Sequence, residues 1–372
     1  MPLTRVAPTP GVAWVATKAP GGAYHKNLFH QLEHVYCFLR KAVYSGRAPE
    51  AILWPYATMP LTRALVAALL PGTRWHETCC GRDKVAARWW KGAREPCSCW
   101  QKVCTARFSA FWPDGAAGRA AHRAIRDAAH AHCALRRRVP PSAGPRGVVV
   151  RLLERPWGSA RQWDERSLLL ETLREAAGGV AGGVRGVTVE TRRLAAKLEA
   201  NGTALAPGSR LCDQLGWFAG AAVLVTPHGA ANALSPFADA GTLVVEVLPY
   251  AYKPESPVPT NFIEALLANT DIAYMELRSA LPLAPPAKVN AASSHGHGAR
   301  AASAKAPDHL NHPLSQDESA CREDKACRLA FRDAAGLRLD APSRQQLRSA
   351  IASRTLWAPG CSIRTHERRH TE

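Results

Sequence analysis

Apolar and polar residues alternate along the first part of the chain in patterns typical of three helices and one strand. Apolar residues recur at steps of three and four over residues 27–39, which predicts an amphipathic helix. A short apolar run over 51–54 predicts a buried strand, and residues 62–70 predict a second helix. Residues 119–138 predict a third, very basic helix, whereas the proline-containing residues 1–20 are expected to form an irregular arm.

The second part of the chain has continuous apolar runs rich in β-branched residues, which are typical of strands buried on both faces. Such runs cover 148–153, 222–226 and 242–247, and a shorter strand is expected over 187–190. Helical patterns lie between them, over 165–177, 211–219 and 230–237. Because strands and helices alternate, the pattern predicts right-handed crossovers and a parallel sheet with helices on both faces.

Two stretches of altered composition divide the chain. Proline, glycine and serine gather over 140–147, and residues 281–316 are a low-complexity run of Ala, Pro, Ser and His that is expected to be disordered. We therefore expect an α/β protein with an N-terminal domain over 1–140, a linker over 141–147, a C-terminal domain over 148–280, a low-complexity linker over 281–316 and a charged C-terminal tail over 317–372.

Positive charge is concentrated in the first part of the chain. The net charge is +18, and residues 1–150 contain 22 Lys and Arg against 7 Asp and Glu, whereas residues 151–372 contain 26 against 23. Such a surface attracts polyanions such as nucleic acid, acidic lipid or phosphorylated ligands, although a solvated basic helix face explains the same count. An apolar fraction of 47% with a charged fraction of 21% excludes a wholly disordered chain.

The sequence shows neither a membrane-spanning segment nor a secretory signal. No apolar run approaches the roughly 18 residues that a spanning helix needs. Residues 1–20 also lack the apolar core of a signal peptide. If the protein belongs to a secretory compartment, we expect its targeting segment to be missing or unusual. Asn201, in the triplet Asn-Gly-Thr, is a candidate glycosylation site and slightly favours such a compartment.

The cysteines and a histidine-rich segment leave several interpretations open. Five cysteines fall between Cys79 and Cys104 without the paired C-x2-C spacing of zinc knuckles, so disulfides, a zinc site and free thiols all fit them. Cys321 and Cys327 could close a small loop late in the chain. The histidines within 295–312 could bind a metal, but we expect a solvated tail there.

The candidate ligand site lies where two predicted strands end. His228, Gly229 and Ala230 follow the strand 222–226 and open a helix, whose first N–H groups and dipole favour a phosphate. Gly229 lets a ligand approach the backbone closely. Glu246 ends the neighbouring strand, where its carboxylate could accept hydrogen bonds from a ribose diol or from sugar hydroxyls. The residues alone thus predict an α/β domain that binds a phosphate-bearing ligand.

Residues 211–249 resemble the signature region of the family-61 glycosyltransferases, which include O-linked GlcNAc transferases of the secretory pathway and plant xylosyltransferases. The matches are an acidic-Gln pair, an H-G-A triplet, a Phe and a Glu that closes the last strand, found at Asp213-Gln214, His228-Gly229-Ala230, Phe237 and Glu246. Upstream, Arg155 and Arg161 fall on two arginines of the family, and residues 27–30 resemble its N-x-x-H.

The resemblance covers roughly half the chain and departs from the family pattern at several positions. Ala231 replaces a Gly, Asn232 a Leu and Leu234 an Asn or His, so one polar contact to the donor is either lost or partly supplied by Asn232. His34 stands where the family has an acid, with Glu33 one place earlier. Residues 57–145 match nothing in the family.

The resemblance implies a GT-B architecture, in which two Rossmann-like domains with parallel sheets face each other across a cleft. The C-terminal domain would then bind the nucleotide sugar, and the N-terminal domain the acceptor. The implied donor-binding residues are His228, Gly229, Ala230, Glu246, Arg155 and Arg161. No D-x-D motif is present to chelate a catalytic metal, so neither a metal nor another cofactor is expected. The arginines and the helix start would instead neutralise the departing diphosphate.

The implied reaction is an inverting transfer of GlcNAc or xylose from a UDP-sugar to a hydroxyl of a protein or glycan. Such a displacement needs a general base from the N-terminal domain, and Glu33, His34 and His30 are the candidates. The implied location is the lumen of the Golgi or endoplasmic reticulum. Membrane attachment would require an anchor that is not seen in this chain, and no nucleic-acid partner is expected.

Two other classes of function stay open at this point. The first is a non-catalytic pseudoenzyme or polyanion-binding module that uses the arginine-rich first half. The second is a cytosolic α/β enzyme with a different phosphorylated ligand, which would keep its cysteines reduced and carry no glycan on Asn201.

Overall fold

The computed structural model describes two parallel β-sheets with helices between and around them. The described residues are 3, 6–15, 28–54, 58, 60–77, 112, 115–135, 149–155, 161–178, 188–193, 209–253, 262–282 and 317–355. The strand order is β1-β2-β3 in the first sheet and β5-β4-β6-β7-β8 in the second. All pairings between these strands are parallel, so the predicted α/β class with parallel sheets is confirmed.

The first sheet consists of β1 (Pro8–Val15), β2 (Ala48–Trp54) and β3 (Arg74–Glu77). Helices α1 (Leu28–Ser45) and α2 (Pro60–Leu69) follow β1 and β2 along the chain. The expected irregular arm is wrong for residues 8–15, because these pair with β2. Ala13 and Trp14 are almost fully buried, and the edge position of β1 tolerates its prolines.

The second sheet carries the apolar runs that the sequence predicts as strands. Its strands are β4 (Val149–Glu154), β5 (Thr188–Arg193), β6 (Val223–Pro227), β7 (Leu243–Leu248) and β8 (Ala273–Arg278). The elements between them include α6 (Arg166–Gly178), α7 (Ser209–Phe218), the 3-10 helix η4 (Ala230–Phe237) and α8 (Phe262–Leu267). Every residue of β6 and β7 is buried, as expected for central strands of a parallel sheet.

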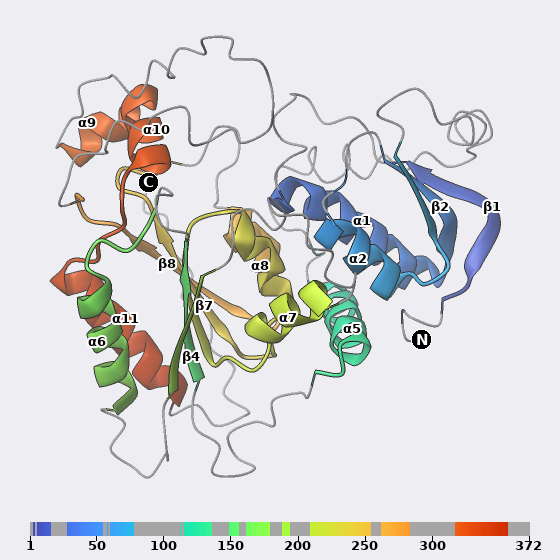
Figure 1. Cartoon of the computed structure of the whole chain (residues 1–372), viewed down its shortest axis with the longest axis horizontal. Coiled ribbons are helices and arrows are strands. Elements are labelled where there is room, and N and C mark those ends of the chain that lie inside the picture. Colours follow the sequence, from blue (N-terminus) through green and yellow to red (C-terminus); the bar gives the residue numbers. More distant parts are fainter. Residues whose placement is uncertain are drawn as a thin grey trace.

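A shared helical layer lies between the two sheets (Figure 1), formed by α1, α2, α5 (Gly115–His132), α7 and α8. Residues from both halves of the chain form one apolar cluster in this layer, including Leu32 and Phe38 of α1 and Leu215 and Phe218 of α7. Tyr36 of α1 donates a hydrogen bond of 2.6 Å to the carbonyl of Ala233 in η4. The two halves are therefore joined by continuous packing in the described part of the chain.

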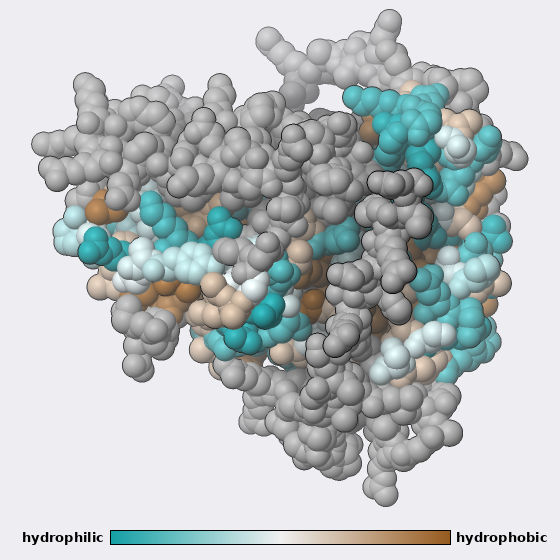
Figure 2. Space-filling model, turned by 180° about the vertical axis from the view of Figure 1, so that it is seen from behind, coloured by the Kyte–Doolittle hydropathy of each residue, from teal (hydrophilic) through white to brown (hydrophobic). Residues whose placement is uncertain are grey.

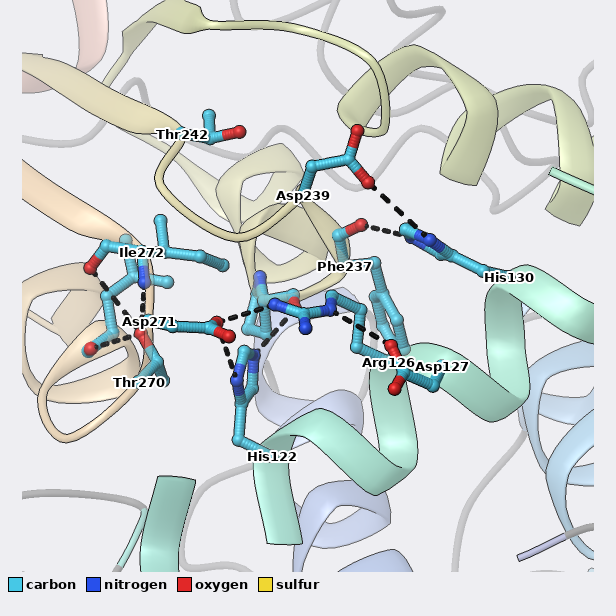
Figure 3. Close-up of polar contacts among 12 residues, drawn as sticks. His122, Arg126, Asp127, His130, Phe237, Asp239, Thr242, Thr270, Asp271 and Ile272 are labelled. Atoms are coloured by element: carbon cyan, nitrogen blue, oxygen red, sulfur yellow. Dashed lines mark hydrogen bonds and ion pairs between the residues drawn. The ribbon is translucent and has the colours of Figure 1, made fainter. Parts of the chain in front are cut away.

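Helix α5 holds the two halves together through one polar face (Figure 3). His122, Arg126 and His130 share this face because they are spaced four residues apart. The Nε2 atoms of His122 and His130 lie 2.8 and 2.7 Å from the carbonyl oxygens of Pro236 and Phe237, at the end of η4. A disulfide between Cys133 and Cys212, which the sequence did not predict, adds a covalent link from the end of α5 to α7.

An ion pair completes the attachment of α5. The guanidinium of Arg126 donates to the carboxylate of Asp271 at 2.5 Å, and Nδ1 of His122 lies 3.4 Å from the same oxygen. Burial alone would raise the pKa of Asp271, but hydrogen bonds from His122 and Arg126 and the charge of Arg126 outweigh it and lower the pKa to about 2. Part of the basic helix predicted over 119–138 is thus neutralised inside the protein.

The segment expected as a charged C-terminal tail forms three packed helices in its described part. These are α9 (Glu318–Glu323), α10 (Lys325–Ala334) and α11 (Ala341–Thr355). Leu347 and Ile351 of α11 are fully buried in the cluster that also contains Leu173 of α6. Helices α6 and α11 cover the outer face of the second sheet (Figure 1), so residues 317–355 belong to the folded protein rather than to a tail.

The surface of the described residues is mixed in character. In Figure 2, hydrophilic residues gather at the corner that α9 and α10 occupy. Lys253 forms an ion pair of 2.6 Å with Glu323, the last residue of α9. No helix among the described residues has both the length and the apolar character that crossing a membrane requires.

Candidate functional site

His228 lies at the carboxyl end of β6, beside the middle of the second sheet. The register pairs Thr226 of β6 with Glu246 of β7, and the amide of His228 continues the ladder by donating to the carbonyl of Val247 at 2.9 Å. The His228 side chain turns back toward β7, where its Nδ1 lies 2.9 Å from Oε1 of Glu246. The structure therefore brings together the histidine and the glutamate that the sequence analysis singled out.

Glu246 is completely buried and its carboxylate binds protein groups. Besides His228, it accepts hydrogen bonds from Nδ2 of Asn232 on η4 at 3.1 Å and from the hydroxyl of Tyr274 on β8 at 3.1 Å. Burial, followed by the nearby charge of Glu246, raises the pKa of Tyr274 well above its usual range, so this hydroxyl stays a donor. The expected contact of Glu246 with ribose or sugar hydroxyls would need these donors to move.

The imidazole of His228 has one nitrogen held by the protein. Its Nδ1 faces Glu246, and its ring centroid lies 4.9 Å from that of Tyr252. The side chain keeps 16% of its surface exposed, and no hydrogen bond from a described residue reaches Nε2. An ionised carboxylate accepts and does not donate, so this contact favours a hydrogen on Nδ1 rather than on Nε2.

Two arginines surround the turn that follows His228. Arg161 donates from NH1 to the carbonyl of His228 at 2.7 Å. A Cβ added to Gly229 would lie 3.6 Å from NH1 of Arg161 and 3.8 Å from NH1 of Arg155, so both guanidinium groups approach this glycine. Guanidinium groups that converge beside a helix start form an environment that favours an anion.

The C-terminal segment fixes the position of Arg161. The amide of Arg161 donates to the carbonyl of Ala335 at 2.7 Å, and residues 162–164 exchange backbone hydrogen bonds with Leu337. Arg161 adopts a φ of +62°, which is uncommon for a residue other than glycine. The chain beyond α10 therefore contributes to the geometry of the candidate site, which the sequence analysis did not foresee.

The positions that depart from the family-61 pattern have internal roles here. Leu234 is fully buried in the shared core, so it offers no polar group to a ligand. Asn232 is also fully buried, and its Nδ2 donates to the carbonyl of Pro227 at 3.2 Å as well as to Glu246. Ala230 is partly buried at the start of η4. Asn232 thus supports the His228–Glu246 pair from inside the fold.

The candidate bases on α1 differ in their surroundings. His34 is buried, and its ring packs edge-on against Trp54 with centroids 5.5 Å apart. Glu33 is partly exposed and lies one turn before Tyr36, which contacts η4. The side chain of His30 lies outside the described part of the chain. Of the two described candidates, Glu33 is the more accessible.

Several other candidate sites fall outside the described residues. These are Asn201, the cysteines between Cys79 and Cys104, and the histidines within 295–312. Cys321 and Cys327, which the sequence analysis left as a possible pair, form a disulfide. Within the described ranges, His, Cys, Asp and Glu side chains form no group of three or more suited to a metal ion. The metal-free chemistry expected from the sequence stays a prediction.

The fold and the site together define an α/β protein with two parallel sheets and a positively charged turn at the carboxyl edge of the second. No model of a known protein family matches the chain, and no curated protein matches it either.

Sequence reasoning missed the residues that complete the site from within. Tyr274 belongs to β8, a strand that the sequence analysis did not predict, and it lies opposite Val244 in the register. The sequence signal for this strand was a weak alternation over 272–277, where apolar residues flank Tyr274 and Glu276. The internal role of Asn232 had no signal in the sequence, because it depends on the distance to Glu246 across the fold.

Proposed function

We propose that the protein is an inverting, metal-independent glycosyltransferase related to family 61, which uses a nucleotide sugar as donor. The observation that carries the proposal is the approach of both Arg155 and Arg161 to Gly229, beside an accessible His228. Two fixed positive charges at the start of η4 suit a nucleoside diphosphate, whose negative charge grows as the sugar leaves. The carboxyl edge of a parallel sheet is also the usual location of such ligands.

In this proposal the two sheets belong to facing domains of a GT-B type enzyme. The second sheet binds the UDP-sugar, and the first presents the acceptor. The acceptor hydroxyl gives its proton to a base and bonds to the anomeric carbon, while the bond from that carbon to the diphosphate oxygen breaks. Glu33 is the favoured base because it is partly exposed on the helix that contacts η4. The donor sugar is GlcNAc or xylose, and the acceptor is a protein or glycan.

The disulfides support a luminal location for this activity. Bonds between Cys133 and Cys212 and between Cys321 and Cys327 are typical of proteins that fold in an oxidising compartment. We therefore propose the lumen of the Golgi or endoplasmic reticulum as the location, with Asn201 as a glycan acceptor. Mass spectrometry of protein from a secretory host tests both features, and reduced cysteines with an unmodified Asn201 would contradict this location.

The direct test of the function is ligand binding followed by turnover. A thermal-shift series with UDP, UDP-GlcNAc, UDP-xylose, GDP and ADP identifies the nucleotide, since a ligand of the native state raises the melting temperature. Arg155→Gln and Arg161→Gln are each expected to weaken binding of the selected nucleotide about tenfold or more, the usual loss for a charge-assisted hydrogen bond. Arg166→Gln is the matched control, because Arg166 pairs with Glu154 instead.

The outcomes separate the proposed enzyme from its alternatives. Binding of a UDP-sugar with release of UDP in the presence of an acceptor mixture supports the transferase. Binding without turnover, even with acceptors of both classes, would instead indicate a pseudoenzyme. No binding to any of the five nucleotides, together with salt-sensitive binding to DNA or heparin, would reject the proposal in favour of a polyanion-binding module.

A further inference from the structure

We infer that Glu246 is a positioning residue which, together with Asn232 and Tyr274, fixes the imidazole of His228 with its hydrogen on Nδ1 and presents Nε2 to the ligand. This inference deepens the proposed function and rests on it for the identity of the ligand. It differs from the role expected for Glu246 from the sequence, in which the carboxylate itself contacts a sugar or ribose.

The first argument is the number and type of groups around the carboxylate. Nδ2 of Asn232 can only donate, and the hydroxyl of Tyr274 stays protonated, so both oxygens of Glu246 already act as acceptors. An ionised carboxylate that is completely buried requires such donors, because an unsatisfied buried charge is very costly. Nδ1 of His228, 2.9 Å from Oε1, satisfies the same carboxylate best when it carries a hydrogen.

The second argument is that the neighbouring groups hold His228 from several sides. Asn232 contacts both Glu246 and the carbonyl of Pro227, which immediately precedes His228. Arg161 donates to the carbonyl of His228 itself at 2.7 Å. Tyr252 lies against the ring with a centroid distance of 4.9 Å. Backbone and ring are therefore both fixed, so the direction of Nε2 is set before a ligand arrives.

The consequence is chemical as well as geometric. With Nδ1 held by Glu246, the second nitrogen of the ring can accept a hydrogen bond when neutral or donate one when the ring is protonated. A positive ring beside Glu246 would be stabilised by the carboxylate, and its Nε2–H could donate to a phosphate oxygen. His228 is thus prepared to act together with Arg155 and Arg161, which approach the turn at Gly229, while Glu246 acts only through His228.

A ligand-free measurement tests this arrangement first. Two-bond proton–nitrogen correlation spectra of the full chain with 15N-labelled histidine report which ring nitrogen carries the hydrogen. The signals of His228 are found by their loss in His228→Gln. For the neutral ring of His228 in the wild-type protein we expect a hydrogen on Nδ1, and a hydrogen on Nε2 would overturn the inference. This measurement needs no variant of Glu246 to fold.

Substitution of Glu246 gives the second test. In Glu246→Gln the amide can donate to Nδ1, so we expect the hydrogen of the neutral ring to shift toward Nε2. Glu276→Gln is the matched control, because Glu276 pairs with Glu246 in the register of β8 and forms its ion pair with Arg278. An unchanged His228 spectrum in Glu246→Gln, at a stability that keeps the protein folded, would contradict the positioning role.

Calorimetric titration with UDP then separates this inference from the proposed function. We expect Glu246→Gln to weaken UDP binding about tenfold, which corresponds to the loss of one charge-assisted contact. We expect Glu276→Gln to change UDP binding less than twofold. If UDP binds the wild type and both variants equally well, the proposed function stands and Glu246 has no positioning role for the ligand. If UDP binds none of them while His228 shows the expected tautomer, the positioning within the fold stands and the ligand assignment fails.

Discussion

The ion pair between Asp271 and Arg126 is expected to make the attachment of α5 sensitive to acid. Asp271 precedes β8 and Arg126 lies on α5, so the pair links the two halves of the chain. The Arg126 side chain is only 8% exposed and that of Asp271 20%, so water screens the interaction little. We predict that Asp271→Asn destabilises the protein at neutral pH by an amount that follows from the pKa of Asp271.

The magnitude comes from the shift of that pKa on folding. The pKa of Asp271 falls from 3.8 to about 2, and each unit corresponds to about 1.4 kcal/mol, so the ionised carboxylate contributes about 2 kcal/mol. The sign follows from proton binding. Between about pH 4 and pH 2 the unfolded chain binds a proton that the folded protein does not. The contribution is therefore complete above about pH 4 and is lost as the pH falls through 2.

The assay is urea unfolding at pH 7, 5, 3 and 2, with the free energy of unfolding compared between variants. Asp271→Asn should be less stable than the wild type by about 2 kcal/mol at pH 7, and the difference should shrink below about pH 4. Asp127→Asn is the control, because Asp127 lies 3.5 Å from Nε of Arg126 but is more exposed. Equal effects of the two substitutions, or a difference for Asp271→Asn that does not depend on pH, would refute the reasoning.

Three further predictions test other parts of the structure. Replacing both Cys133 and Cys212 by Ser should cost about 2–4 kcal/mol of unfolding free energy, since the disulfide joins residues with a sequence separation of 79. Unchanged stability in urea would show that this disulfide does not constrain the unfolded chain. Leu347→Ala should cost about 2–5 kcal/mol of unfolding free energy, because it opens a cavity between α11 and α6. Gln345 is exposed on the same helix, so Gln345→Ala should cost less than about 0.5 kcal/mol. Similar costs for the two substitutions would show that α11 does not pack against the core. Tyr36→Phe should cost about 1–2 kcal/mol in the same assay, because the buried carbonyl of Ala233 loses its donor, and a neutral effect would remove this contact between α1 and η4.

The sequence was a good guide wherever local pattern and burial agree. The apolar runs that became β4, β6 and β7 are the three inner strands of the second sheet, and their mostly buried positions keep the runs largely apolar. The weaker strands β1 and β8 were missed because edge strands are partly exposed and mix polar with apolar residues. A similar reason applies to α11, whose few buried apolar residues lie among many polar ones.

The chain itself determined that His228 follows a buried strand and that Glu246 lies in the next one, because strand order and residue spacing are local properties. It also determined that His122, Arg126 and His130 share a helix face, but not what that face binds. Only the tertiary structure decided those partners, since Pro236, Phe237 and Asp271 lie more than a hundred residues away in the sequence. The role of Glu246 was decided in the same way: whether a carboxylate meets a ligand or the protein's own donors depends on distances of a few tenths of an ångström, which only packing sets.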